Sequence, residues 1–132
     1  MPTSNDPSAA RILIVDDQRS NVRLLEQTLR RAGYDAVSST TEPREVGALH
    51  VQNDYDLILL DLQMPQMTGF EVMNELQGTR AAHPVSILVL SADSTQTRAV
   101  MAAGADAFLG KPFRLPDVVE RVQGMLQARG TP

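Results

Sequence analysis

Ile12-Leu13-Ile14-Val15 is followed directly by Asp16 and Asp17, and Leu57-Ile58-Leu59-Leu60 is followed directly by Asp61. Four consecutive apolar residues that stop at a charge predict a strand buried on both faces of a parallel sheet. Acidic residues placed after such strands lie at the carboxyl edge of the sheet, where open α/β folds form their ligand crevice. The two stretches therefore predict an α/β fold with three carboxylates near one edge.

Strand-like and helix-like segments alternate about five times along the chain, which is typical of βαβ units around a parallel sheet. The expected strands are 12–15, 36–39, 56–60, 85–90 and 107–109. The expected helices are one after the first strand that ends at Gly33, one capped by Thr41, and 70–76, 97–103 and 115–126. The first, third and fourth strands are apolar throughout and belong in the centre, so right-handed crossovers favour a doubly wound sheet of order 2-1-3-4-5. In that order the three carboxylates converge.

Composition limits the possible partners. A chain of 132 residues with 42% hydrophobic residues is long enough for one domain with a real core. We expect a disordered lead over 1–10, a domain over 11–128 and a short tail over 129–132. The net charge of −4 argues against general binding to nucleic acid or to an anionic membrane. No segment reads as a signal peptide or a membrane span, and the absence of cysteine excludes disulfides and thiolate metal sites, so the cytoplasm is the default location.

The acidic residues predict a metal-dependent phosphoryl-transfer site. Clustered carboxylates repel one another unless a cation is present, and hard oxygen ligands without His or Cys suit Mg²⁺. Lys111 is the only lysine beside eleven arginines, and it follows the last expected strand. A carboxylate such as Asp61 can act as the nucleophile in phosphoryl transfer, while a metal and one ammonium neutralise the charge.

Four motifs, in this order and spacing, resemble the receiver domain of two-component response regulators. They are Ile12 to Asp17, Asp56 to Pro65 followed by Gly69, Ser91-Ala92, and Phe108 to Phe113. The resemblance covers about residues 11 to 128 and implies a flavodoxin-like receiver fold. It also implies that Asp61 accepts a phosphoryl group from the phosphohistidine of a histidine kinase or a histidine phosphotransfer protein. Asp17, Asp61 and the backbone carbonyl of Gln63 would bind Mg²⁺ directly, and Asp16 would act mostly through water.

The same resemblance assigns the residues that respond to phosphorylation. Lys111 would pair with the phosphoryl oxygens, and its peptide bond to Pro112 is expected to be cis. The hydroxyl of Ser91 would also bind the phosphoryl group, and Phe108 would turn inward when Ser91 moves. Taken alone, Ser91 is better explained as a loop hydroxyl that caps the next helix, and Phe108 is equally well explained as a fixed core aromatic.

Three further positions tune this expectation. Gln63 and Asp93 match family positions that flank the mouth of the pocket and influence how long the phosphoryl group survives. Ala107 stands where regulators that dimerise through shared salt bridges have an aspartate, so we expect a monomer.

His50 and His83 do not lie at strand ends, and we expect both at the surface.

We therefore expect a phosphorylation-controlled switch that acts on a downstream protein effector and is no enzyme beyond its own phosphotransfer and dephosphorylation. It would be either a single-domain receiver or a part of a longer regulator. The alternative is a Mg²⁺-dependent phosphohydrolase with an aspartyl nucleophile. That enzyme needs a second acid two residues after the nucleophile, where this chain has Gln63. A nucleotide-binding module would need a glycine-rich loop after the first strand, and Asp16-Asp17-Gln18-Arg19 has the wrong chemistry.

Overall fold

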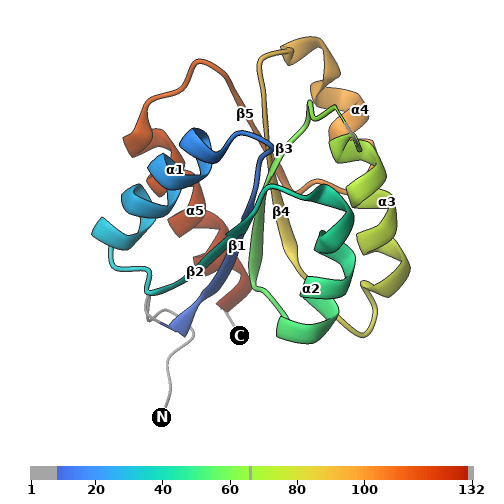
Figure 1. Cartoon of the computed structure of the whole chain (residues 1–132), viewed down its shortest axis with the longest axis horizontal. Coiled ribbons are helices and arrows are strands. Elements are labelled where there is room, and N and C mark those ends of the chain that lie inside the picture. Colours follow the sequence, from blue (N-terminus) through green and yellow to red (C-terminus); the bar gives the residue numbers. More distant parts are fainter. Residues whose placement is uncertain (1–8, 66, 131–132) are drawn as a thin grey trace.

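The computed structural model describes residues 9–65 and 67–130 as a parallel sheet with helices on both faces (Figure 1). The strands are β1 (Arg11–Val15), β2 (Ala36–Thr40), β3 (Leu57–Asp61), β4 (Ser86–Ser91) and β5 (Ala107–Gly110). Their order is β2-β1-β3-β4-β5, so the doubly wound arrangement predicted from the sequence is confirmed. The expected lead lies mostly outside the described residues.

Helices cover the sheet on both sides because the central strands are apolar on both sides. The helices are α1 (Arg19–Arg31), η2 (Pro43–Glu45), α2 (Val46–Asn53), α3 (Gly69–Thr79), η3 (Ser94–Gln96), α4 (Thr97–Ala102) and α5 (Leu115–Gly130). One core cluster joins α1 and α5 to alternate strand residues such as Ile14 and Leu59, and the other joins α2, α3 and α4 to residues such as Leu13 and Ile58. Figure 1 shows the two groups of helices on opposite faces of the sheet. None of the helices in the described part of the chain is long and apolar enough to span a membrane.

Helix ends differ in places from the sequence prediction. The turn after β2 is capped by Glu42, whose side chain accepts a hydrogen bond from the backbone N–H of Arg44 at 3.3 Å, and the expected cap at Thr41 is wrong. Pro43 explains the difference: its fixed φ starts the turn, and the residue before a proline is held in extended backbone, which is the geometry of a cap. At the other end of the chain, α5 continues to Gly130, two residues past the expected domain boundary.

His50 is fully buried, so its predicted surface position is wrong. The ring Nδ1 accepts a hydrogen bond from the backbone N–H of Tyr55 at 3.1 Å, and Nε2 lies 2.9 Å from the carbonyl oxygen of His83, to which it donates. His83 in turn lies with its ring Nδ1 2.5 Å from Oδ1 of Asp54, the residue that ends α2 in the left-handed conformation. These bonds fasten the end of α2 to the connection between α3 and β4.

Arg80 fastens the neighbouring part of the molecule, at the edge of the sheet where β4 and β5 begin. Its guanidinium donates to the carbonyl oxygens of Gly104 at 3.0 Å and Val85 at 3.1 Å, and to Oδ2 of Asp106 at 3.0 Å. The same Asp106 oxygen accepts the backbone N–H of Ile87 at 2.8 Å. The end of α3 is therefore tied to the starts of both β4 and β5.

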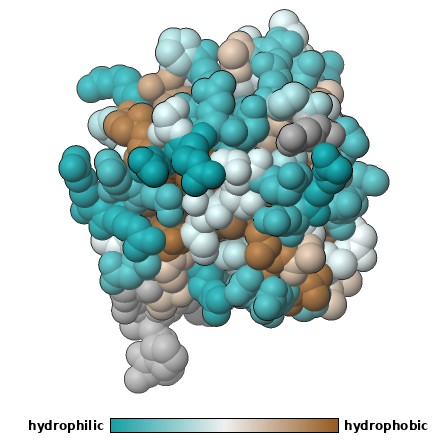
Figure 2. All heavy atoms as spheres, in the orientation of Figure 1, coloured by the Kyte–Doolittle hydropathy of each residue, from teal (hydrophilic) through white to brown (hydrophobic). Residues whose placement is uncertain are grey.

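The exposed apolar area is dispersed. Figure 2 shows a face that is mostly hydrophilic, with apolar side chains in small separate groups. The large apolar side chains that are most exposed among the described residues are Leu24 on α1, Val51 on α2 and Met101 on α4. Because each lies on a different helix, they do not form one broad apolar patch.

We predict that His50→Ala lowers the free energy of unfolding by about 2–4 kcal/mol in urea titrations. The substitution leaves the N–H of Tyr55 and the carbonyl of His83 without their partner inside the protein, and each such loss costs about 1–3 kcal/mol. Val51→Ala, at the next and exposed position, is the matched control and should change stability by less than about 0.5 kcal/mol. Equal effects of the two substitutions would contradict a structural role for the ring.

Candidate functional site

The pairing of β1 with β3 brings the acidic residues together. Val15 lies opposite Leu60 in the register, so Asp16 and Asp61, the next residue of each chain segment, reach the carboxyl edge side by side. Asp17 follows in the loop after β1. One carboxylate oxygen from each of Asp16, Asp17 and Asp61 lies within 4.8 Å of the others. The convergence that the predicted strand order requires is therefore present.

The three carboxylates are held differently. Asp16 is buried, with Oδ1 accepting the backbone N–H of Gln18 at 2.9 Å and Oδ2 accepting Nδ2 of Asn21 at 3.3 Å. Asp61 is also buried, and its Oδ1 accepts a hydrogen bond from Nζ of Lys111 at 3.1 Å. Asp17 is half-buried, and no described residue donates a hydrogen bond to its carboxylate. Two acids are thus fixed in orientation, while the third can adjust to a ligand.

Lys111 reaches the acids because the ends of β4 and β5 hold its backbone. Its N–H donates to the carbonyl of Ser91 at 2.8 Å, continuing the pairing of the two strands beyond Gly110. The peptide bond between Lys111 and Pro112 is cis, as the resemblance implies. The ammonium Nζ lies 3.1 Å from Oδ1 of Asp61, so Asp61 has a positive partner in Lys111 as well as negative neighbours in Asp16 and Asp17.

Burial raises the pKa of Asp61 above its ordinary value, because the charged form loses its hydration. The positive charge of Lys111 and its hydrogen bond oppose this shift, while the negative charges of Asp16 and Asp17 add to it. Three carboxylates and one ammonium leave two negative charges unbalanced at this edge. A divalent cation with hard oxygen ligands fits both the charge and the donor set.

Gly69 allows the loop after β3 to pass close to Asp61. A Cβ at this position would lie 2.9 Å from Cα of Leu62 and 3.2 Å from the carbonyl oxygen of Asp61. The backbone N–H of Gly69 donates to the carbonyl of Leu62 at 2.9 Å, and a capping box of Thr68 and Glu71 starts α3 at this point. Glycine is required here because any side chain would push against the backbone that carries the phosphoacceptor candidate.

The other predicted residues lie around this edge. Ser91 is buried at the end of β4, and its Oγ accepts the backbone N–H of Asp93 at 3.1 Å. The carboxylate of Asp93 caps η3 by accepting the N–H of Thr95 at 3.0 Å. Phe108 is half-buried and packs against the core under α2, α3 and α4. The side chain of Gln63 is exposed at the start of the loop after β3.

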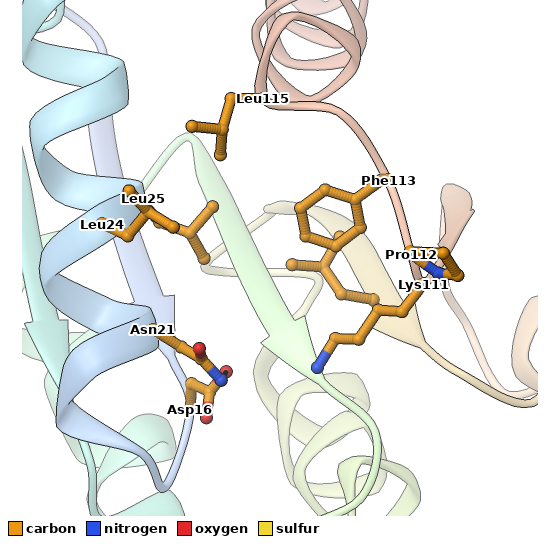
Figure 3. Close-up of a pocket in the computed structure, with 9 residues that line it drawn as sticks. Asp16, Asn21, Leu24, Leu25, Lys111, Pro112, Phe113 and Leu115 are labelled. Carbon is orange, nitrogen blue, oxygen red and sulfur yellow. Dashed lines mark hydrogen bonds between the residues drawn. The ribbon is translucent and has the colours of Figure 1, made fainter.

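A cavity lies beside the acids, between α1 and the loop that follows β5 (Figure 3). It is lined by Asp16, Asn21, Leu24, Leu25, Leu90, Lys111, Pro112, Phe113 and Leu115. Asn21 is the site residue that the sequence reasoning missed. The available signal is its place in the first turn of α1, because side chains of a helix point back toward its N-terminus and here toward the end of β1.

Comparison with known proteins decides the family. The family model described as "Response regulator receiver domain" matches residues 12–123. The chain belongs to the response regulator receiver domain family. This receiver domain is 33% identical over 124 residues to the transcriptional regulatory protein PrrA of Mycobacterium tuberculosis, covering 94% of this chain and 53% of PrrA.

Two further comparisons agree. The alkaline phosphatase synthesis transcriptional regulatory protein PhoP of Bacillus subtilis is 31% identical over 117 residues, covering 89% of this chain and 48% of PhoP. The chemotaxis protein CheY4 of Vibrio cholerae has a solved structure with a TM-score of 0.80 and 30% identity, covering 88% of this chain and 98% of that chain. The receiver domain spans about half the length of the two curated relatives, whose names describe transcriptional regulation. The expectation that this protein does not bind nucleic acid therefore stays a prediction.

We predict that Asp61→Asn stabilises the metal-free receiver domain at neutral pH. Because the folded state raises the pKa of Asp61, it binds the proton more tightly than the unfolded chain does. The wild-type protein therefore loses stability as the pH rises from the unfolded pKa of about 3.9 through the raised folded pKa, and asparagine avoids this loss. Urea unfolding in a chelator should show a gain at pH 7 that disappears below about pH 3.9. A gain of equal size at every pH would contradict this cause.

Proposed function

We propose that this receiver domain accepts a phosphoryl group on Asp61 from the phosphohistidine of a histidine kinase or a histidine phosphotransfer protein. The observation that carries the proposal is that Asp61 both belongs to the acidic cluster with Asp16 and Asp17 and pairs with the ammonium of Lys111 at 3.1 Å, at the carboxyl edge of the sheet. The family supports a role in phosphorylation-controlled signalling. Asp61 is buried, so reaction there changes the environment of neighbouring groups rather than only the surface.

The reaction forms one bond and breaks one. An oxygen of the ionised Asp61 carboxylate attacks phosphorus, the P–N bond to the donor imidazole breaks, and the imidazole nitrogen leaves with its electron pair and takes a proton from solvent. The ammonium of Lys111, 3.1 Å from Oδ1 of Asp61, would balance negative charge on the transferring group.

Mg²⁺ is the proposed cofactor. Asp17, Asp61 and the backbone carbonyl of Gln63 would bind it directly, and Asp16 would bind mostly through water. The fit rests on the three convergent carboxylates and the two unbalanced negative charges at this edge. When bound, the ion supplies charge neutralisation for the nucleophile and the phosphoryl oxygens.

The proposed response involves Ser91, Phe108 and the surface of α4, β5 and α5. Ser91 is joined to Lys111 through the backbone and to Asp93 through its hydroxyl, so a shift of Ser91 toward the phosphoryl group alters the connection that leads into η3 and α4. Phe108 is half-buried and packs against the core, so it would turn further inward only in the proposed response. Phosphorylation would then shift an existing equilibrium between two conformations, as a ligand does. The shift would change the surface that the domain offers to a protein effector.

The outcome is a switch and not a catalyst acting on other molecules. Self-catalysed phosphotransfer and dephosphorylation would be its only chemistry. Gln63 supports this proposal against a phosphohydrolase, because an amide cannot act as the acid that protonates a leaving group. Ala107 carries no charge on β5, which supports a monomer over a dimer held by salt bridges on this face.

We predict that acetyl phosphate with Mg²⁺ adds one phosphoryl group to the wild-type protein and none to Asp61→Asn. Intact-mass spectrometry is the measurement. Asp56→Asn is a matched control, because Asp56 precedes the opposite end of the same strand and lies outside the acidic cluster. That control should be labelled like the wild type. Labelling of Asp61→Asn to the same extent would overturn the assignment.

We predict that Lys111→Arg still accepts the phosphoryl group but does not transmit the change. Arginine keeps the positive charge, but its planar fork cannot replace a compact ammonium that reaches Asp61 from the end of β5. Amide NMR spectra of the variant should therefore lack the phosphorylation-induced shifts at Ser91 and Phe108 that the wild type shows. Shifts of wild-type size would mean that the lysine does not relay the signal.

A further inference from the structure

Asn21 holds a carboxylate of the acidic cluster in place. It is the third residue of α1, is half-buried, and lines the cavity beside Asp16 and Lys111. Figure 3 shows its amide nitrogen turned toward the carboxylate of Asp16. Nδ2 of Asn21 donates to Oδ2 of Asp16 at 3.3 Å and to Oε1 of Gln18 at 3.4 Å. Both hydrogens of the amide group are used, which fixes the nitrogen, and not the oxygen, toward the acid.

The bond from Asn21 completes a two-sided grip on Asp16. Oδ1 of Asp16 accepts the backbone N–H of Gln18, so each carboxylate oxygen has one donor from the chain and keeps one lone pair for another partner. Because one donor is the N-cap residue Gln18 and the other, Asn21, lies three positions later in the first turn of α1, the start of the helix sets the rotation of the carboxylate. Asp17, whose carboxylate has no donor among the described residues, lacks such a grip.

A neutral donor suits this position better than a charged one. An amide hydrogen bond orients the carboxylate of Asp16 without adding positive charge. Lysine or arginine at the same place would balance one of the carboxylates and repel a cation. Asn21 therefore leaves the negative charge of the cluster unchanged while it restricts the rotation of the Asp16 carboxylate.

We propose that Asn21 is a positioning residue for the divalent cation, acting through Asp16. This inference rests on the proposed Mg²⁺ site and adds a residue that the metal-binding motif does not contain. Groups that orient the ligands of a metal contribute about 10–100-fold to affinity, and Asp16 is expected to act mostly through water, so the lower end of that range applies.

Titration of the unphosphorylated protein with Mg²⁺, followed by amide NMR shifts, tests the proposal without any phosphotransfer. Asn21→Ala should weaken Mg²⁺ binding about tenfold. Alanine is well tolerated in a helix and Asn21 is half-buried, so the variant should fold. Ser20→Ala is the matched control, because Ser20 is the exposed residue before Asn21 in the first turn of α1 and takes no part in the hydrogen bonds that hold Asp16. It should bind Mg²⁺ within about twofold of the wild type.

A double-mutant cycle with Asp16→Asn shows whether Asn21 acts through Asp16. In that background Asn21→Ala should change the Mg²⁺ dissociation constant by less than about twofold, because the carboxylate it orients is gone. A tenfold loss in both backgrounds, or wild-type affinity in the single variant, would overturn the inference and leave the proposed function intact. A wild-type protein without Mg²⁺-dependent shifts would overturn the metal site and this inference together.

Discussion

The parallel pairing of β1 and β3 is the constraint on which the rest of the site depends. Clustered carboxylates repel one another, because each ionised carboxylate raises the free energy of ionising the next one. Here the register of two buried strands places Asp16 and Asp61 side by side, since Val15 and Leu60, the residues before them, are paired in the sheet. Hydrophobic burial on both faces of the sheet therefore stabilises an electrostatic arrangement that is unfavourable by itself. In the proposed function, this arrangement serves to bind a cation and a phosphoryl group.

The repulsion among the three carboxylates is limited in a different way for each acid. Asp16 is held by two neutral donors, Asp61 by the single ammonium of Lys111, and Asp17 is left half-exposed to water. Only one of the three carboxylates is thus paired with a formal positive charge. Had each acid an arginine partner, the negative charges would be balanced and the edge would not attract a metal ion. Burial is the main cause of the raised pKa of Asp61, and the negative charges of Asp16 and Asp17 add to it.

The sequence predicts those features that depend on periodicity and on strand ends. Apolar runs such as Leu57 to Leu60 determine the central strands, and from them the sheet order and the meeting of the acids follow. Features that depend on distant partners escape such reasoning. His50 looks like a surface residue until the carbonyl of His83, thirty-three residues away, is seen to accept its hydrogen bond. Asn21 escapes for a different reason: its spacing of five residues from Asp16 crosses from a strand into a helix, so neither period applies.

The two edges of the sheet differ in how firmly they are tied, and this difference gives the proposed switch a direction. At the amino edge, Arg80 and His50 join loops and helix ends through several hydrogen bonds to backbone carbonyls. At the carboxyl edge, the connection from Ser91 into η3 and α4 depends on the hydroxyl of Ser91 and the cap formed by Asp93. α4 has only six residues, too few to resist rearrangement at its start through its own hydrogen bonds. In the proposed switch, phosphorylation of Asp61 would therefore displace α4 and β5 more easily than the opposite edge of the sheet. That edge would keep its position because several hydrogen bonds hold it.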